Sequence, residues 1–151
     1  MIYVRRILQP GETILAQGRP HWIAYWRALL CFAIALAIFL MPMPRANAAI
    51  GQIGAAFMAI VGFMFWLNAM FYRWTTEIGV TDRRVVYKRG FISRQTAEMN
   101  MDKVESVLVD QTLTGRLLNY GTITIKGTGA SIENLRRIAD PIALRNAITA
   151  R

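Results

Sequence analysis

Few residues of this chain are of the types that carry out catalysis. Among its 151 residues there are one cysteine, Cys31, and one histidine, His21. Zinc sites and activated thiol nucleophiles combine several Cys and His side chains, and a lone cysteine also excludes a disulfide within the chain. We therefore expect no metal, no other cofactor and no Cys–His catalytic pair.

The other residues that could serve a reaction show no catalytic spacing. Gly127-Thr128-Gly129 lacks the lysine and the helix start of a phosphate-binding loop, and Ser131 has no base nearby in the sequence. The carboxylates of the second half fit turn or surface roles; they are Asp82, Glu98, Asp102, Glu105 and Asp110. The sequence predicts a binding protein and no enzyme, with no evident small-molecule substrate.

Basic residues are the most prominent chemical feature of the chain. It has 18 Lys and Arg against 9 Asp and Glu, which gives a net charge of +9. Such an excess attracts either nucleic acid or an anionic lipid surface. A nucleic-acid surface combines cations with aromatic rings, whereas most aromatic residues here lie in two apolar runs. We therefore expect membrane lipids as a partner and no nucleic acid.

These two apolar runs account for the high hydrophobic content of 54%. The first covers about residues 22–41, and a helix of 20 residues spans a hydrocarbon core of about 30 Å. The second covers about residues 48–72 and carries no charge. Pro42 and Pro44 end the first helix, and the connection is only long enough for a turn. The sequence predicts a transmembrane helical hairpin over residues 22–73.

The distribution of charge predicts the orientation of this hairpin. Seventeen of the 18 positive charges precede Ala28 or follow the second run, and only Arg45 lies in the turn. Under the positive-inside rule, both termini are then cytoplasmic and the protein is multi-pass. The alternative is a cleaved secretory signal that ends at Ala46-Asn47-Ala48, for which a leading region of 27 residues is long.

Small residues form a stripe along one face of the second run. Gly51, Ala55, Ala59 and Gly62 follow one another at spacings of four, four and three. Such stripes allow helix backbones to approach closely in lipid. The stripe fits packing against the first helix of the same chain, and it also fits a face for self-association or for another membrane protein. Both interpretations stay open.

Residues 74–151 have the pattern of a small β-rich cytoplasmic domain, and residues 1–21 precede the hairpin as a cytoplasmic N-terminal segment. Polar and apolar residues alternate cleanly over 120–126, where Ile123 and Ile125 share one face. Shorter β-prone runs cover most of residues 75–109. The stretch from 131 to 138 is ambiguous between a last strand and a loop.

Local signals predict turns and two helical pieces in this domain. Asp140 fits an N-cap and Pro141 the first position of a C-terminal helix. Asp82 is expected to hold a tight turn by bonding to the backbone two residues on. Residues 113–118 are expected to form a helical turn whose leucines seal one edge of the sheet.

Several short motifs lie in order through nearly the whole chain: Pro10-Gly11-Glu12, Arg19-Pro20-His21-Trp22, Thr81-Asp82-Arg83-Arg84-Val85, Gly90, Met101-Asp102-Lys103-Val104, Gln111, the run Gly115-Arg116-Leu117-Leu118-Asn119-Tyr120-Gly121-Thr122, and Asp140-Pro141. Together they resemble the bacterial pleckstrin-homology-like membrane proteins called bacterial PH domain 2 or YdbS-like. The resemblance implies a bacterial inner (plasma) membrane location and no catalytic residues.

The expected fold class is therefore an α+β membrane protein. A two-helix transmembrane hairpin is followed by a PH-like β-sandwich or partly open barrel, which a C-terminal helix caps. The resemblance implies a bent seven-stranded sheet for this domain.

Seven basic residues are candidates for contact with anionic lipid: Arg27, Arg73, Arg83, Arg84, Lys88, Arg89 and Arg94. Alternate residues of a strand face one way, so Arg84 and Lys88 can share a face. The alternative is an ordinary solvated charged face. Lipid-binding PH domains use a basic loop between their first two strands, whereas the connection around Asp82 is tight, so specific headgroup recognition is not expected.

The predicted function is that of a membrane-anchored adaptor or accessory subunit. It would bind another membrane protein or a second copy of itself, with its basic face held at the anionic cytoplasmic leaflet. Two alternatives are a component of an oligomeric channel or transporter and a module that binds a lipid headgroup.

Overall fold

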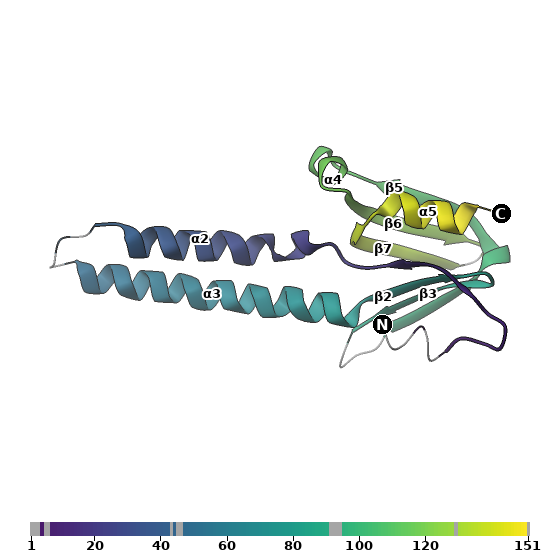
Figure 1. Cartoon of the computed structure of the whole chain (residues 1–151), viewed down its shortest axis with the longest axis horizontal. Helices are drawn as coiled ribbons and strands as arrows, with labels where there is room; N and C mark the ends of the chain where they lie inside the picture. Colours follow the sequence, from purple (N-terminus) through teal and green to yellow (C-terminus); the bar gives the residue numbers. More distant parts are fainter. Residues whose placement is uncertain are drawn as a thin grey trace. The chain divides into compact units, whose positions relative to one another are not determined.

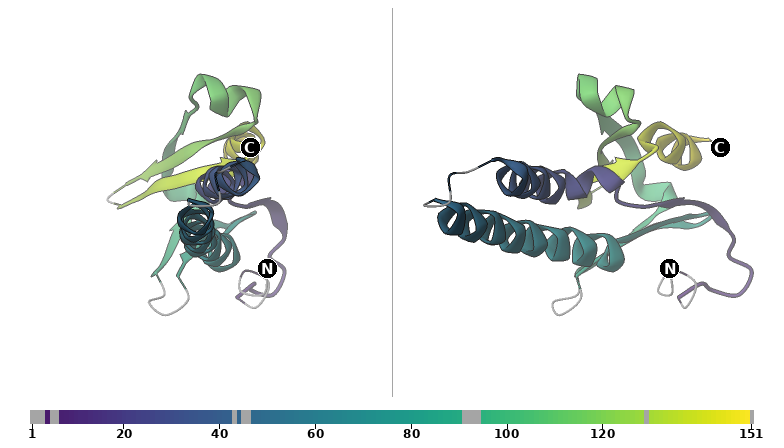
Figure 2. Two further views of the ribbon diagram at one scale, coloured as in Figure 1. Left: turned by 90° about the vertical axis from the view of Figure 1, so that its left-hand side faces the viewer. Right: turned by 60° about the vertical axis from the view of Figure 1, so that its left-hand side comes forward.

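The computed structural model describes residue 4 and residues 7–42, 44, 47–90, 95–128 and 130–150. The chain divides into two compact units (Figures 1 and 2). Trp22–Phe71 form a helical unit, and Met1–His21 together with Tyr72–Arg151 form a β unit. The first 21 residues, which we treated above as a segment of their own, are thus grouped with the β-rich domain.

The helical unit contains two long apolar helices. A 3₁₀ turn, η1 (Trp22–Tyr25), leads into α2 (Trp26–Leu40), and α3 (Ala48–Thr75) runs antiparallel beside it (Figure 1). Their apolar windows have mean hydropathies of 2.2 and 1.9, and only 17% of each window is buried. The core helix of a soluble protein would be mostly buried. Both helices are long and apolar enough to cross a membrane.

Seven strands form two antiparallel sheets in the described part of the β unit. The first sheet has the order β1 (Ile14–Gly18), β2 (Glu77–Thr81), β3 (Arg84–Arg89) and β4 (Gln95–Asn100), and the second has the order β5 (Val104–Asp110), β6 (Tyr120–Gly127) and β7 (Ala130–Ala139). The turn η2 (Met101–Lys103) joins the sheets, α4 (Leu113–Leu117) joins β5 to β6, and α5 (Pro141–Thr149) ends the domain. The expected fold class is confirmed.

Strand β1 was not predicted, and it changes how the two units are connected. It lies before the helices in the sequence but pairs with β2, which follows them, with Gln17 opposite Gly79 and Gly18 opposite Ile78. The helical unit is therefore an insertion between the first and second strands of the β unit. The tight turn at Asp82 joins β2 to β3, so it is not the connection between the first two strands that we took it for.

A second set of contacts ties the chain to the other sheet just before the helices begin. Pro20 forms an isolated bridge with Ile138 of β7. The backbone N–H of Ala139 donates to the carbonyl of Arg19 at 2.9 Å, and the N–H of His21 donates to the carbonyl of Arg137 at 2.6 Å. The segment after β1 thus joins the edges of both sheets.

The core of the β unit lies between the sheets and is covered by α5. Ile123 and Ile125 of β6 are fully buried, as the alternation predicted. They pack with Ile78 and Val85 of the first sheet, and α5 contributes Leu144 to the same cluster. A Cβ on Gly18 of β1 would lie only 2.8 Å from the Leu144 side chain, so β1 and α5 approach closely where the residue is glycine.

The C-terminal helix begins where it was expected, with Asp140 at the N-cap position and Pro141 as the first helical residue, but Asp140 makes no side-chain cap: its backbone is left-handed at φ 49°, and its N–H donates to the carbonyl of Asn119 at 3.0 Å. Two other local expectations were wrong. Asp82 accepts a 2.9 Å bond from the N–H of Thr13, far away in the sequence, instead of bonding within its own turn. The leucines of α4 do not seal a sheet edge, because Leu113 and Leu117 are both exposed to solvent.

Candidate functional site

The chain leaves and re-enters the β unit at one end, which we call the exit end. It is defined by His21, the last residue before the helical unit, and Tyr72, the first residue after that unit, in the last turn of α3. The His21 ring stacks on Tyr120 of β6, with ring centroids 5.4 Å apart. The Tyr72 hydroxyl donates to the carbonyl of Arg136 of β7 at 2.8 Å. Both connections are thus fixed to the second sheet.

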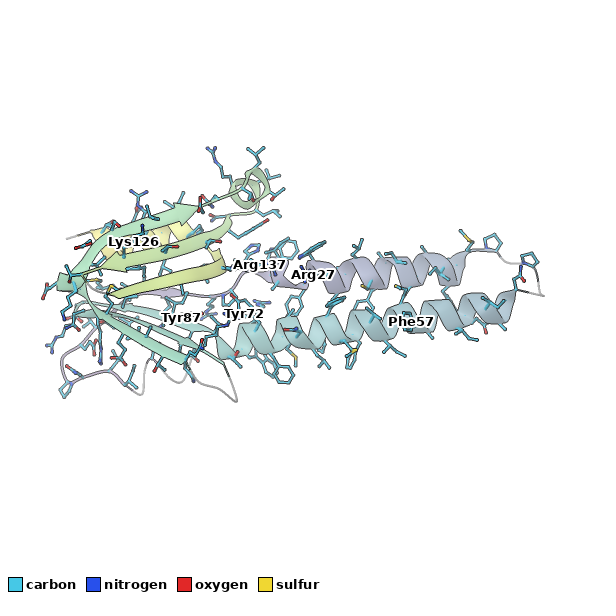
Figure 3. The ribbon with its side chains drawn as sticks, turned by 180° about the vertical axis from the view of Figure 1, so that it is seen from behind. Arg27, Phe57, Tyr72, Tyr87, Lys126 and Arg137 are labelled. Atoms are coloured by element: carbon cyan, nitrogen blue, oxygen red, sulfur yellow. The ribbon has the colours of Figure 1, made fainter. Side chains whose placement is uncertain are left out.

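Arginines gather around Tyr72 at the exit end. The guanidinium carbon of Arg89 lies 5.7 Å from the centre of the Tyr72 ring, a cation–π distance. Arg136 and Arg137 are also charged neighbours of Tyr72, and Figure 3 shows Tyr72, Tyr87 and Arg137 at this end of the β unit. The exit end is therefore positively charged.

The histidine at the exit end does not add to this charge at neutral pH. Burial of the His21 ring, together with the positive charge of Arg73, lowers the pKa of His21 below its usual value of 6.5. Burial raises the pKa of Tyr87 above its usual value of 10.0, so its hydroxyl is neutral as well. The positive charge of this end comes from its arginines and Lys88, against the carboxylate of Glu77, which lies opposite Lys88 in the sheet.

The basic residues proposed from the sequence do not form one patch. Arg73 follows Tyr72 at the exit end and Arg89 ends β3 there, next to Lys88, whereas Arg83 lies in the turn at the other end of β2. Five residues of strand span about 17 Å, or about two Debye lengths at physiological salt. Arg83 is therefore too far from the exit end to reinforce its field.

The other two members of the predicted set lie elsewhere. Arg27 belongs to the helical unit, where its guanidinium carbon lies 5.6 Å from the Trp26 ring. Arg94 lies outside the described residues.

Arg84 has a structural role that we did not predict. Its guanidinium forms a two-pronged ion pair with Glu12, with Nε and Nη2 each 3.0 Å from a carboxylate oxygen. The Glu12 side chain is fully buried and that of Arg84 is 15% exposed. A third bond joins Arg84 Nη1 to Glu98 at 2.8 Å. The charge of Arg84 is compensated within the β unit, so we no longer count it among the lipid contacts.

The remaining lone pairs of Glu12 are also satisfied. The Thr81 hydroxyl donates to Glu12 Oε1 at 2.7 Å, and the backbone N–H of Gln9 donates to Oε2 at 2.8 Å. Hydrogen bonds from Arg84 and the charge of its guanidinium hold the pKa of Glu12 at about 2, against an ordinary value of 4.5. This network fixes the segment before β1 to the first sheet.

The same segment covers the outer face of the first sheet with an apolar contact. Val4 is buried, and a Cβ on Gly79 of β2 would lie only 2.5 Å from the Val4 side chain. Arg84 Nη2 donates to the carbonyl of Ile7 at 2.8 Å. Val4 thus covers the outer face of the first sheet at β2.

The stripe of small residues has two different environments along α3. Ala55 and Gly62 are buried, and a Cβ on Gly62 would lie 3.1 Å from the Cβ of Cys31 and from the Phe32 ring on α2. Gly51 and Ala59 are only half-buried. Gly62 thus allows close packing within the chain.

A shallow apolar groove lies beside this stripe, between the two helices. It is lined by Ala35, Leu36, Phe39, Gln52, Ala55, Ala56 and Ala59. Ala59 therefore borders an open groove, whereas Gly62 packs against α2.

Sequence reasoning missed two features of the exit end. Arg136 and Arg137 fall in the stretch that was ambiguous between strand and loop, so no face could be assigned to them. The exposed leucines of α4 were taken for sheet contacts because of their apolar character alone.

The two sheets and the C-terminal helix define a PH-like module that carries a two-helix insertion. The chain belongs to the bacterial PH domain family, whose sequence profile matches residues 24–151. This match begins after β1. No curated protein and no solved structure shows significant similarity to the chain.

We expect Glu12→Gln to destabilise the β unit by about 3–5 kcal/mol, because it removes the buried counter-charge of the Arg84 guanidinium and leaves only the more exposed Glu98 beside it. Hydrogen exchange of the β2 and β3 amides measures the free energy of opening. The matched control is Glu98→Gln, since Glu98 is 41% exposed and bonds the same arginine; such a pair contributes about 0–1 kcal/mol. Equal losses of stability from the two substitutions would show that the burial of Glu12 does not strengthen its ion pair.

Glu12→Gln and Glu98→Gln should also differ in how the free energy of unfolding depends on pH. The folded-state pKa of Glu12 lies below the ordinary value, so the unfolded state takes up the proton first as the pH falls. The stabilisation is fully present above pH 4.5 and is lost as the pH falls towards about 2; the shift is worth about 3 kcal/mol. Glu12→Gln should flatten this part of the stability profile. An unchanged slope would contradict the buried ion pair.

Gly62→Cys should form a disulfide with the native Cys31 inside one chain. The two Cβ atoms would start 3.1 Å apart, and disulfides have a mean Cβ–Cβ distance of about 3.8 Å, so a small adjustment suffices. Mass spectrometry after mild oxidation in membranes identifies the crosslink. The control is Gly54→Cys on the same helix, whose Cβ would meet nothing within 4 Å. Crosslinks only between chains at position 62 would show that this face meets another copy instead of α2.

Proposed function

We propose that this protein is a membrane-anchored PH-like adaptor or accessory subunit without catalytic activity. Its helical unit crosses the bacterial inner membrane, and the β unit and both termini lie in the cytoplasm. The exit-end arginines rest on the anionic leaflet, and the module binds another membrane protein or a second copy of itself.

The connection between the units is the observation that carries this proposal. Because the helices are inserted between β1 and β2, the chain passes through the exit end twice, at His21 and at Tyr72. A hairpin that spans a bilayer brings both of these residues to the same interface. The end of the β unit that is covalently joined to the membrane is then the end that carries Arg73, Arg89, Arg136 and Arg137.

Electrostatics supports the placement on an anionic leaflet. Each Lys or Arg near such a surface contributes about 1 kcal/mol of attraction. The excess of positive charge on both sides of the helices and its near-absence from the turn favour a cytoplasmic β unit.

Partner binding is supported by surfaces of both units. The helical unit offers the apolar groove beside Ala59. In the β unit, β4 ends its sheet with β3 as its neighbour, and a terminal strand can accept a further strand from a partner. Purification from native membranes in mild detergent tests this part: a reproducible second protein supports a hetero-complex, and recovery of this chain alone supports self-assembly.

Neutralising the exit end should loosen the β unit from anionic membranes. In nanodiscs, anionic lipid should slow hydrogen exchange of the backbone amides at the exit end. We expect Arg89→Gln/Arg136→Gln to reduce this added protection by about fivefold per arginine. The control is Arg83→Gln/Lys103→Gln, which removes the same charge at the other end. In zwitterionic nanodiscs the three proteins should behave alike. An equal effect of both double substitutions would contradict an oriented contact.

A further inference from the structure

The short helix α4 is held in place by hydrogen bonds around its first turn and to Tyr120. The Thr112 hydroxyl accepts the N–H of Gly115 at 3.1 Å, and the hydroxyls of Thr114 and Tyr120 lie 3.1 Å apart. The Gln111 side-chain amide donates to the carbonyl of Tyr120 at 3.1 Å. A Cβ on Gly115 would lie 2.7 Å from that carbonyl oxygen, so α4 approaches the start of β6 as closely as only glycine permits. These contacts fix α4 against the start of β6.

This fixed helix turns its apolar side chains outward. Leu113 and Leu117, four residues apart, lie on one face of the turn and are each 85% exposed, more than any other large apolar side chain of the described residues. Leu118 is partly exposed beside them, and Arg116 between them is exposed as well. Thr112 and Thr114 are exposed too, although their hydroxyls are hydrogen-bonded to Gly115 and Tyr120. Such an arrangement is typical of a contact surface.

The helix belongs to the exit end of the β unit. Tyr120 bonds to Thr114 of α4 through its hydroxyl and stacks on His21 through its ring. His21 is followed directly by Trp22, the first residue of the apolar segment Trp22–Leu40. One tyrosine thus links the exposed leucines to the point where the chain enters the helical unit. Figure 1 shows α4 between the ends of β5 and β6.

We propose that α4 is an interfacial membrane anchor, which inserts Leu113 and Leu117 into the acyl boundary of the leaflet while Arg116 contacts anionic headgroups. The proposal deepens the proposed function and rests on it, because the hairpin must bring the exit end to a bilayer. Lipid fits this surface since leucines flanking an arginine match the boundary between acyl chains and headgroups, and since the chain continues from this end into an apolar helix.

Environment-sensitive labelling of the full chain tests the proposal. In a Cys31→Ser background, Leu117→Cys carries the fluorophore NBD, and the protein is reconstituted into vesicles of zwitterionic and anionic phospholipid. Asn100→Cys, exposed at the opposite end of the β unit, is the matched control. We expect quenching by lipids with a shallow doxyl group and protection from aqueous iodide for position 117 only.

A third label separates the proposal from the function on which it rests. Leu36→Cys lies on α2 and is exposed in the helical unit. If doxyl lipids quench position 36 but only iodide quenches position 117, the hairpin is in the bilayer and the α4 anchor is refuted. If position 36 is reached only by iodide, the proposed function itself fails. Protection of position 117 from both quenchers would show a protein contact, such as a second copy, and would also refute the anchor.

A substitution of the other leucine provides a second measurement. Leu113→Ser in the labelled Leu117→Cys protein should lower the inserted population at least about tenfold, since it removes the burial of one leucine. Leu15→Ser, an equally apolar exposed position on β1, should leave the quenching unchanged. Equal quenching in all three proteins would show that Leu113 is not in the lipid.

Discussion

The pairing of β1 with β2 is the constraint on which the rest of the structure depends. These strands are neighbours in the sheet, yet the whole helical unit separates them in the sequence. Closing a flexible loop of this length costs about 4 kcal/mol of chain entropy. An antiparallel hairpin removes most of this cost, because its two ends already lie together. The helical hairpin thus has two roles. It brings β1 and β2 close enough to pair, and its helices are the segments that can enter a membrane.

The buried network around Glu12 completes this arrangement from the N-terminal side. Because Glu12 precedes β1 and Arg84 begins β3, their ion pair fixes the segment before β1 to the sheet that forms after the helices. Its polar groups are satisfied by Thr81 and Gln9, so the pair avoids the cost of an unpaired buried charge. It also compensates the charge of one arginine, so Arg84 adds little to the positive charge of the surface.

Local patterns in the sequence were sufficient for elements that carry their own signal. The two helices follow from length and composition, and the alternation around Ile123 and Ile125 identified both the strand and its buried face. Strand β1 was missed because it has only five residues, two of which are exposed, and because its partner follows the helices. The role of Arg84 was missed for a similar reason, since its counter-ion Glu12 is 72 residues away.

The same limit explains the error at α4. An apolar residue in a small domain is usually buried, so Leu113 and Leu117 were assigned to the sheet. The orientation of α4 depends on Tyr120, whose hydroxyl bonds to Thr114 and whose carbonyl accepts from Gln111, and no pattern within the five-residue helix shows which side a later tyrosine will bind. Contacts outside the helix thus decide which side chains α4 presents at the exit end.

The topology of the two units across a sealed membrane tests the central claim most directly. Single cysteines are placed at Thr13, Asn47 and Asp102 in the Cys31→Ser background. They report on the N-terminal segment, the connection between the two helices and the β unit. A membrane-impermeant maleimide is applied to vesicles of known orientation. We predict that Asn47→Cys reacts only from the periplasmic side and that Thr13→Cys and Asp102→Cys react only from the cytoplasmic side. Reaction of all three from one side would contradict a spanning hairpin that joins β1 to β2.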